Sequence, residues 1–206
     1  MNKKGYFITF EGIDGCGKTT QLDSVYDLLT GLGFECVKTR EPGALDLGKK
    51  IREILLHHKG VVSDKCEMFL FLADRAQHMD TLIRPSVEAG KIVLCDRHTD
   101  STIAYQGYGR EQDIDKLIKL NEIATSGMKP DLTFVFDVTT KTGAERAGSN
   151  PDRMEASGKE FFERVRKGYI ELSEKYSDRI KVIDGEKSKE LVYNEVKSNI
   201  MDLMGL

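Results

Sequence analysis

Five short apolar runs, separated by longer stretches with helical periodicity, constrain the fold of this 206-residue chain more than any other feature. The runs are rich in Val, Ile, Phe and Thr and lie at residues 6–10, 34–38, 92–95, 132–138 and 180–183. Their apolar residues are nearly continuous rather than alternating, which is typical of strands covered on both faces. The helical patterns lie at residues 18–32, 46–58, 64–89, 111–127, 157–177 and 187–204. This alternation predicts an α/β fold in which a parallel sheet has helices on both sides.

Length and composition limit the class of protein. The chain is long enough to bury a full core but short for two domains, so we expect one domain over residues 1–206. Hydrophobic residues make up 39% and charged residues 32%, and the net charge of −3 argues against a nucleic-acid partner. No apolar run approaches the roughly 20 residues that span a membrane, and Glu11 interrupts the first run too early for a signal peptide. We therefore expect a cytoplasmic protein with no membrane partner.

The cysteines, at positions 16, 36, 66 and 95, form no C-x-x-C pair, so the sequence has neither a zinc nor a redox signature. Cys36 and Cys95 lie in strand-like apolar runs and are expected to be core thiols. Cys16 lies close to Lys18 near the start of a predicted helix, where thiol pKa values tend to fall. That position predicts a reactive thiol, and the alternative is a small residue tolerated in a tight loop.

A glycine-rich stretch with the spacing Gly12-x-x-x-x-Gly17-Lys18-Thr19 directly follows the first apolar run. Glycine lets the backbone turn tightly, so that successive N–H groups and the start of the following helix face phosphate oxygens. In such a loop Lys18 reaches the β- and γ-phosphates, and the Thr19 hydroxyl ligates Mg²⁺. The alternative is a turn that only caps a helix. We predict an ATP-binding loop over residues 12–19, formed by Gly12, Ile13, Asp14, Gly15, Cys16, Gly17, Lys18 and Thr19.

Polar segments follow the second and third apolar runs, at Thr39–Gly43 and Asp96–His98. In an open parallel sheet, ligands bind beyond the carboxyl ends of the strands. Asp96 stands where many phosphate-loop enzymes have an acidic residue near Mg²⁺, although it could also cap a helix. Arg97 offers a planar fork of donors for a phosphate, and its alternative is a surface ion pair.

Aromatic and polar side chains recur one helical turn apart in two further segments. Phe71 and Arg75 share a face of a predicted helix, and Ser101 and Tyr105 are similarly spaced just beyond Arg97. An aromatic plane beside a fork of donors can stack on a nucleobase and bond its edge, whereas the alternative for Phe71 is a place in the core. These side chains are therefore candidates for a second, acceptor site.

Together these segments resemble the thymidylate kinase family. The matching pieces occur in the family's order over about residues 7 to 172 and are FEGIDGCGKTT, TREPG, LFLADRAQH, CDRHTDSTIAYQGYGR, PDLTFVFDV, DRME and FFERVRKGY. The resemblance implies transfer of the γ-phosphoryl group of ATP to dTMP, which gives dTDP, with Mg²⁺ as cofactor. It also implies the P-loop nucleoside monophosphate kinase fold, with a five-stranded parallel sheet, a lid and a homodimer.

The resemblance further implies a set of acceptor-binding residues, most of them in a region at about 39–106. They are Asp14, Glu41, Arg52, Phe71, Arg75, Arg97, Ser101, Thr102, Tyr105 and Gln106. Phe71 would stack on thymine, and Arg75 and Gln106 would bond its polar edge. Asp14 would bind the sugar 3′-hydroxyl, and Tyr105 would fill the space that a ribose 2′-hydroxyl needs.

The remaining implied roles concern the phosphate and the edges of the pocket. Arg97 would hold the acceptor phosphate. Ser101 and Thr102 would line the base pocket, and Glu41 and Arg52 would make secondary contacts. The expected metal ligands are Thr19 and Asp96, and the expected catalytic residues are Lys18, Asp96, Arg97 and Arg153.

Two positions depart from the family's pattern. Ala44 stands where the family's bacterial TREPGG loop has a second glycine, which could shift the backbone near the acceptor without removing a side-chain donor. His98 stands where tyrosine is common, which puts the contacts behind the acceptor phosphate in question.

A polar stretch at Gly148–Asp152 interrupts a helical region and predicts a loop within a lid at about 141–156. Some thymidylate kinases carry a basic residue in the phosphate loop after its aspartate, but Gly15 and Cys16 stand there in this chain. The chain therefore resembles the type whose arginines come from the lid. Arg153 is the expected transition-state arginine, and Arg146 would cover the adenine of ATP. The alternative is that both are solvated lid charges.

Rival functions remain open at this point. A deoxynucleoside kinase must deprotonate a sugar hydroxyl with a positioned carboxylate, and Glu11 or Glu41 could serve. Arg97 instead favours a phosphorylated acceptor, which needs no general base because its second pKa is about 6. A GTPase switch would need Asn-Lys-x-Asp after a later strand, whereas Asn2-Lys3 precedes the first strand. The intact phosphate loop disfavours an inactive scaffold.

Overall fold

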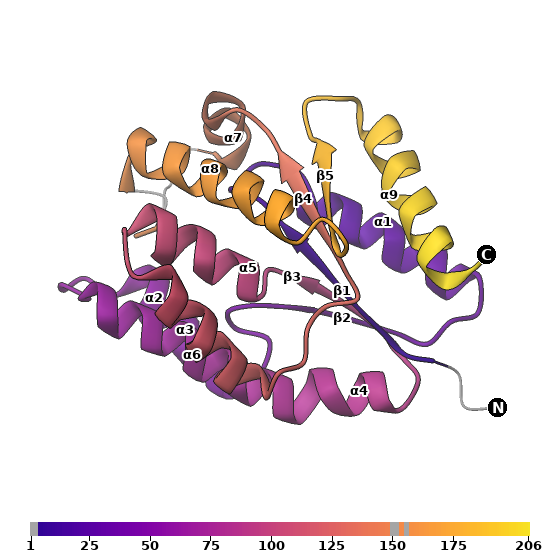
Figure 1. Cartoon of the computed structure of the whole chain (residues 1–206), viewed down its shortest axis with the longest axis horizontal. Coiled ribbons are helices and arrows are strands. Elements are labelled where there is room, and N and C mark those ends of the chain that lie inside the picture. The colour runs from indigo at the N-terminus through magenta and orange to yellow at the C-terminus, as the bar shows by residue number, and fades with distance from the viewer. Residues whose placement is uncertain (1–3, 149–152, 155–156) are drawn as a thin grey trace.

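The computed structural model describes residues 4–148, 153–154 and 157–206, which form a five-stranded sheet covered by helices (Figure 1). The strands are β1 (Tyr6–Glu11), β2 (Cys36–Arg40), β3 (Ile92–Asp96), β4 (Leu132–Asp137) and β5 (Ile180–Asp184). Every pairing is parallel, and the spatial order is β2-β3-β1-β4-β5. The predicted five-stranded parallel sheet flanked by helices is confirmed.

The helices connect successive strands and cover both faces of the sheet. They are α1 (Lys18–Gly31), α2 (Asp46–His57), α3 (Asp64–His78), η1 (Met79–Ile83), α4 (Arg84–Glu88), α5 (Thr99–Thr102), η2 (Ile103–Gly109), α6 (Ile114–Thr125), α7 (Thr140–Ala147), α8 (Lys159–Lys175) and α9 (Lys189–Met204). In Figure 1, α1 and α9 lie side by side on one side of the sheet, while α5 and α8 lie on the other.

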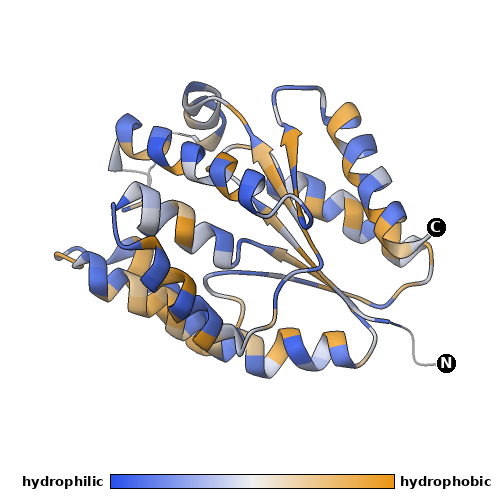
Figure 2. Cartoon of the chain, in the orientation of Figure 1, coloured by the Kyte–Doolittle hydropathy of each residue, from blue (hydrophilic) through white to orange (hydrophobic). Residues whose placement is uncertain are grey.

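The three inner strands, β3, β1 and β4, form the core of the molecule. Phe7, Ile8 and Phe10 of β1 and Phe134 of β4 are completely buried. Figure 2 shows the strands as predominantly hydrophobic and the outer faces of the helices as predominantly hydrophilic. Each buried large apolar side chain contributes roughly 1.5–3 kcal/mol, which explains why nearly continuous apolar runs identify these strands.

The structure differs from the sequence-based expectation in three places. β2 occupies Cys36–Arg40, two residues later than the predicted 34–38. The long pattern at 64–89 is divided by η1, a π-helical turn, into α3 and α4. The helical segment made of α5 and η2 was absent from the predicted helices, because it is short, partly π-helical and contains Gly107 and Gly109.

Two further expectations concerned the burial of Cys36 and Cys95 and the absence of a membrane-spanning segment. Cys95 is buried as predicted, but Cys36 is only partly buried because β2 is an edge strand, so the expectation of a core thiol was wrong for Cys36. Among residues 4–148, 153–154 and 157–206, no helix has the length and apolar character needed to cross a bilayer.

A buried ion pair anchors α5 to the start of β5. Both oxygens of Asp100 accept hydrogen bonds of 2.8 Å from the guanidinium of Arg179, which also donates to Thr133 Oγ1 at 3.0 Å. Asp100 is almost completely buried. A buried carboxylate is tolerated only when its charge is compensated, so this pair fixes the position of α5 and of the side chains that follow it.

Replacing Arg179 with methionine should lower the free energy of unfolding by about 3–5 kcal/mol, because it leaves the buried charge of Asp100 uncompensated. Urea denaturation followed by circular dichroism measures this difference. Lys181→Met is the matched control, since Lys181 lies two residues after Arg179 and its ammonium contacts only the exposed carbonyl of Ser177 among the described hydrogen bonds. An unchanged midpoint for Arg179→Met would contradict the anchoring role.

Candidate active site

The phosphate loop connects β1 to α1 at the carboxyl edge of the sheet. Gly15 has φ +74° and packs so closely on α7 that a Cβ there would overlap the carbonyl oxygen of Gly143. Gly17 has φ +93°, a conformation that side-chain-bearing residues rarely adopt, and α1 begins directly after it. Glycine at these positions is therefore required by the backbone path.

A cavity of about 500 Å³ lies against this loop. Its lining includes loop residues from Gly15 onward and four cationic side chains, Lys18, Arg146, Lys187 and Lys189. The Nζ of Lys18 lies 3.5 Å from the carbonyl oxygen of Ile13 and 3.7 Å from Asp14 Oδ1. The concentration of positive charge beside the start of a helix is suited to a polyphosphate.

Arg146, predicted to contact ATP, lies at the rim of this cavity. Its Nη1 donates to the carbonyl oxygen of Gly185 at 2.9 Å, and its Nη2 lies 3.9 Å from Glu186. The structure therefore brings Arg146, near the carboxyl end of α7, beside the phosphate loop.

The two predicted metal ligands are adjacent. Thr19 Oγ1 donates a 2.9 Å hydrogen bond to Asp96 Oδ2, across the gap between α1 and the end of β3. The described residues contain no cluster of three or more His, Cys, Asp or Glu side chains suited to a metal. Mg²⁺ usually keeps several waters and binds through one or two protein oxygens plus substrate phosphates, so this pair of oxygens fits that ion.

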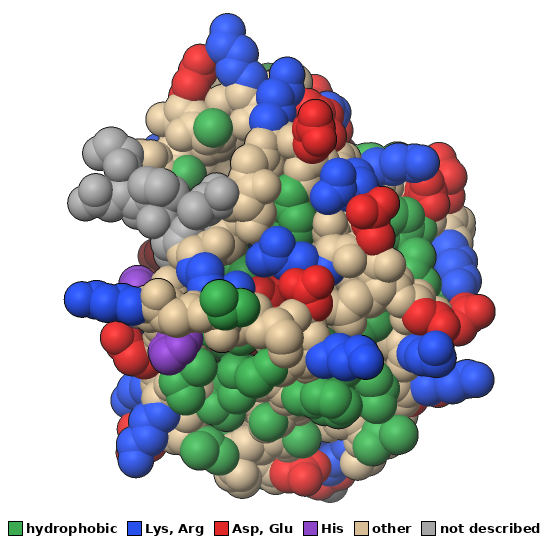
Figure 3. Space-filling model, turned by 90° about the vertical axis from the view of Figure 1, so that its left-hand side faces the viewer, with side chains coloured by type: hydrophobic (Ala, Val, Ile, Leu, Met, Phe, Trp, Pro, Cys, Tyr) green, Lys and Arg blue, Asp and Glu red, His purple; other side chains and the backbone are tan. Residues whose placement is uncertain are grey.

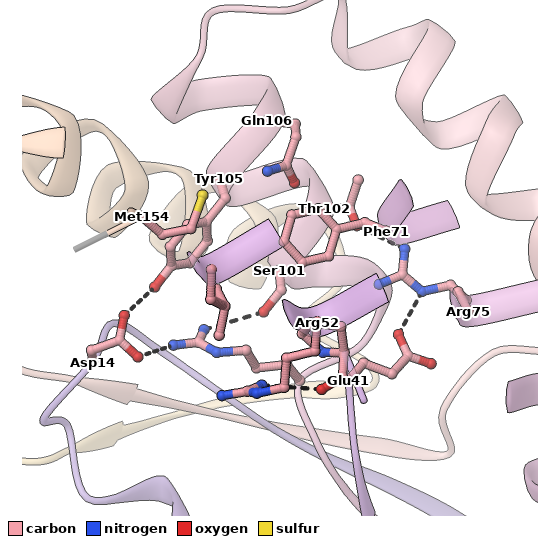
Figure 4. A pocket seen from close by; sticks show the side chains of 13 residues that line it. Asp14, Glu41, Arg52, Phe71, Arg75, Ser101, Thr102, Tyr105, Gln106 and Met154 are labelled. Atoms are coloured by element: carbon pink, nitrogen blue, oxygen red, sulfur yellow. Dashed lines mark hydrogen bonds and ion pairs between the residues drawn. The ribbon is translucent and has the colours of Figure 1, made fainter. Parts of the chain in front are cut away.

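All ten predicted acceptor-binding residues line a second cavity (Figure 4). The cavity has a volume of about 90 Å³ and is lined additionally by Pro42, Leu56 and Met154. Phe71 is partly exposed at its wall, whereas Tyr105 and Gln106 are buried. The residues predicted from the motifs therefore lie together in the structure. Their roles in binding stay predictions.

Arg97 joins the phosphate loop to this second cavity. It adopts φ +70°, which is unusual for a residue with a side chain and costs backbone strain. Its guanidinium donates to the carbonyl oxygen of Gly12 at 2.8 Å and to Asp14 Oδ1 at 2.7 Å, and its Cζ lies 5.0 Å from the centre of the Tyr105 ring. This geometry holds a cation between the two cavities.

Asp14 is the acidic partner of that cation. Burial alone would raise its pKa, but the charges of Arg97 and Lys18 hold the pKa of Asp14 well below its usual range. The hydroxyl of Tyr105 donates to its other oxygen at 3.2 Å. Asp14 is therefore an ionised acceptor at the junction of the two cavities.

Arg75 is more buried, and makes more hydrogen bonds within the protein, than the sequence suggested. Its exposed fraction is only 1%, and four of its five N–H groups donate to other residues. The acceptors are Glu41 Oε2, Thr102 Oγ1, Asn121 Oδ1 and the carbonyl oxygen of His98, at 2.6–2.9 Å. Among the hydrogen bonds of the described residues, one hydrogen of Arg75, on Nη2, has no acceptor.

Glu41 organises the back of the cavity. Its Oε2 pairs with Arg75, and its Oε1 lies 3.0 Å from Nδ1 of both His78 and His98. Burial alone would raise its pKa, but Arg75 and the two imidazoles hold the pKa of Glu41 well below its usual range. Burial lowers the pKa of His98 despite the nearby charge of Glu41, and the completely buried imidazole contacts Glu41 rather than facing the cavity.

Glu11, the other carboxylate considered as a general base, is completely buried. It accepts hydrogen bonds from Ser101 Oγ, the backbone N–H of His98 and the hydroxyl of Tyr169. Burial, together with the nearby charge of Asp100, raises the pKa of Glu11 to about 7. Glu11 does not line the acceptor cavity, which leaves it badly placed to take a proton from a sugar hydroxyl.

The predicted lid is described only in part. Residues 149–152 of the predicted breaker stretch and residues 155–156 lie outside the described residues. Arg153 donates from Nε to the carbonyl oxygen of Leu55 at 2.7 Å, and its Nη2 lies 2.6 Å from Glu67 Oε2. The structure therefore has Arg153 on the acceptor side of the site, away from the phosphate loop.

Sequence reasoning missed two residues of α3 that support the cavity, Glu67 and His78. Both carry the signal that identified Phe71 and Arg75, because Glu67 is four residues before Phe71 and His78 is three residues after Arg75. This spacing places all four on one stripe of the helix. The stripe could have been extended in both directions from the sequence alone.

Comparison with known proteins gives a consistent result over nearly the whole chain. The family model described as Thymidylate kinase matches residues 10–196. The chain is 46% identical to a thymidylate kinase of Desulfovibrio desulfuricans over 204 residues, covering 94% of each chain, and 46% identical to one of Halothermothrix orenii over 198 residues, covering 94% and 95%. It is also similar to the crystal structure of thymidylate kinase from Ehrlichia chaffeensis, with 35% identity, a TM-score of 0.77 and coverage of 95% and 98%.

The expectation of a reactive Cys16 is corrected by the structure. The side chain is 2% exposed, and burial raises the pKa of the Cys16 thiol despite the nearby charge of Lys18. Iodoacetamide at pH 7.5 should therefore label exposed Cys66 first, with Cys16 and Cys95 labelled only slowly. Peptide mass spectrometry over time measures the order. Labelling of Cys16 as fast as Cys66 would contradict this prediction.

Proposed function

The chain belongs to the thymidylate kinase family and phosphorylates dTMP to dTDP with ATP, and we propose that the side chains around its two cavities perform this transfer. The observation that supports this assignment most directly is the position of Asp14, which lines the acceptor cavity, while its neighbours from Gly15 to Thr19 line the other. Two substrates bound in these cavities would meet at the phosphate loop, as direct transfer between them requires.

The acceptor phosphate is assigned to Arg97. Its guanidinium already lies between the cavities, bound to Asp14 and to the carbonyl oxygen of Gly12. The second pKa of a phosphate monoester is about 6, so dTMP arrives as a nucleophile and needs no general base. This chemistry agrees with the arrangement of Glu11 and Glu41, whose oxygens are occupied by donors from the protein.

The base is assigned to Phe71, Arg75 and Gln106. Phe71 presents a partly exposed ring, and Arg75 has one N–H left for a carbonyl oxygen of thymine. Ser101 and Thr102 complete the wall, with Thr102 also fixing Arg75.

The sugar is assigned to the other side of the same cavity. Asp14 would accept a hydrogen bond from the 3′-hydroxyl, and Tyr105 would fill the space beside C2′. The Tyr105 ring is held edge-on by Phe161, Phe162 and Tyr169, with ring centres 6.0–6.4 Å apart. We assign secondary contacts to Glu41 and Arg52, the latter held by the carbonyl oxygen of Pro42 at 3.0 Å.

The donor site is assigned to the phosphate-loop cavity. Loop N–H groups and Lys18 would hold the phosphates of ATP, and Arg146 would cover the adenine. Thr19 and Asp96 would hold Mg²⁺, which neutralises charge on the phosphate oxygens. Lys18 would align the transferred group and stabilise its charge.

The single domain is assigned three functional parts: the phosphate loop at 12–19, the acceptor region at about 39–106 and a lid at about 141–156. Within the lid, we propose that Arg153 stabilises the transition state. Its present partners are Glu67 and the carbonyl oxygen of Leu55. The proposed role therefore requires Arg153 to leave those partners when ATP binds, as lid arginines act only in the closed complex.

We also propose that the protein is a cytoplasmic homodimer. Its cysteines are all free thiols, as expected for a reducing compartment. Hydrophobic side chains gather on the face in Figure 3, and the neighbouring helices α3 and α6 expose Phe69 (57%) and Ile123 (76%). A contiguous exposed apolar surface usually marks a protein interface, and a second copy of this chain is the proposed occupant.

An ADP-release assay with MgATP should give the highest kcat/KM with dTMP, a lower value with dUMP and none above background with thymidine. One missing methyl in an apolar pocket is worth roughly 1–3 kcal/mol, so we expect dUMP to be about 10-fold or more poorer. The panel uses the wild-type protein with nucleosides and monophosphates at equal concentrations. Faster turnover of thymidine than of dTMP would indicate a nucleoside kinase instead.

Arg153→Ala should lower kcat by about 10³-fold or more, as removal of a transition-state arginine does, with a smaller effect on the KM for dTMP. Steady-state kinetics at saturating ATP separates the two parameters. Arg164→Ala serves as a control, because Arg164 is a nearby arginine whose guanidinium binds only the carbonyl oxygen of Gly109 among the described hydrogen bonds. A raised KM with an unchanged kcat in Arg153→Ala would assign Arg153 to the acceptor side alone.

A further inference from the structure

Glu67 is a buried carboxylate that has no part in the roles assigned above. It lies in the first turn of α3, four residues before Phe71 on the same stripe of the helix, and its exposed fraction is 0%. Its Oε1 accepts a hydrogen bond of 2.9 Å from Gln106 Nε2. Gln106 comes from η2, and both it and Phe71 line the acceptor cavity (Figure 4).

Two arginines hold Glu67 in its ionised form. Arg110 donates to both carboxylate oxygens at 3.3 Å, and Arg153 lies 2.6 Å from Oε2. Burial would raise the pKa of Glu67, but the hydrogen bonds from Gln106, Arg110 and Arg153 lower it below its ordinary value. If Arg153 moves during the reaction, Arg110 still supplies a compensating charge.

The ionised state of Glu67 determines which way the amide of Gln106 faces. An ionised carboxylate has no hydrogen to donate and only accepts hydrogen bonds. The amide nitrogen of Gln106, rather than its oxygen, must therefore face Glu67. The reverse orientation would bring two acceptors together in a buried position, which is costly. The amide oxygen and the second N–H of Gln106 remain for a ligand.

The fixed amide has a consequence for the base that it contacts. Thymine presents a donor, N3–H, beside an acceptor, O4, whereas cytosine presents an acceptor, N3, beside an amino donor. An amide of fixed orientation complements one of these edges and must turn over to bond the other. In this site, turning over would direct the amide oxygen of Gln106 at the carboxylate of Glu67.

We propose that Glu67 is a positioning residue that fixes the amide of Gln106, and that it thereby makes the acceptor site select thymine over cytosine. The proposal rests on the assignment of Gln106 to the base edge under the proposed function. Glu67 itself touches neither substrate and acts through Gln106. Arg75, which also faces the base, contributes its own part of the selection, so loss of Glu67 should reduce the selectivity without abolishing it.

The test compares kcat/KM for dTMP with kcat/KM for dCMP in the full-length protein. Glu67→Gln keeps the size of the side chain but can donate as well as accept, so it permits both orientations of Gln106. The ratio of dTMP to dCMP should fall at least 10-fold, mainly through the two KM values. Asp64→Asn is the matched control, because exposed Asp64 faces Arg110 at 3.7 Å on the same helical turn without contacting Gln106. Its ratio should stay within twofold of wild type.

Two further variants keep the outcome decisive. Glu67→Asp retains the charge for the arginines but withdraws the oxygen from Gln106, and it should lower the ratio at least threefold even if Glu67→Gln does not fold. Gln106→Leu removes the amide and should also lower the ratio. A wild-type ratio in a folded Glu67 variant, with a lowered ratio in Gln106→Leu, would overturn the positioning role alone. A wild-type ratio in Gln106→Leu would overturn the contact between Gln106 and the base, and with it that part of the proposed function.

Discussion

The buried ion pair between Glu41 and Arg75 is the contact on which the acceptor side of the molecule depends. Glu41 follows β2, and Arg75 comes from the last turn of α3. Through these two side chains, the pair also fixes the loop after β3 at His98, the end of α5 at Thr102, and α6 at Asn121. Segments that are distant in the sequence thus meet around one pair of opposite charges.

Further charges are buried or partly buried in the molecule, and each is compensated by a named partner. Asp100 pairs with Arg179, Asp14 with Arg97, and Glu67 with arginines. Taking a carboxylate out of water costs several kcal/mol, and a well-packed apolar core would be as stable without that cost. We therefore explain these charges by what their ion pairs and hydrogen bonds do. They hold donors and acceptors in fixed orientations around the two cavities before a substrate arrives.

The strands could be predicted because central strands of a parallel sheet are covered on both faces and leave continuous apolar runs. The grouping of the acceptor residues in one site could be predicted because motifs at the ends of those strands meet at one edge of the sheet. The number and direction of contacts could not be predicted, since they depend on side chains that approach from other segments. Arg75, for example, is recognisable as a base ligand, but only the fold reveals that Asn121 and Thr102 occupy two of its five N–H donors.

The prediction of a reactive thiol at Cys16 was wrong for a related physical reason. Proximity to Lys18 and to the start of a helix can be seen in the sequence, and both favour a thiolate. Desolvation acts in the opposite direction, and its size depends on how completely β1, β4 and α7 enclose the loop. At Cys16 the effect of burial on the thiol pKa is larger than that of the nearby charge. The extent of this burial cannot be predicted from the neighbouring residues in the sequence.

The volume of the acceptor cavity, about 90 Å³ with Met154 in its wall, has a consequence for binding. Sites for small molecules usually measure roughly 300–1,000 Å³, so the form described here is a contracted one and a nucleotide must select or create a wider form. The measured dissociation constant is then the intrinsic constant divided by the fraction of molecules in which the acceptor cavity is already in its wider form. Substitutions that shift this equilibrium would change the affinity for the acceptor while leaving every contact with it intact.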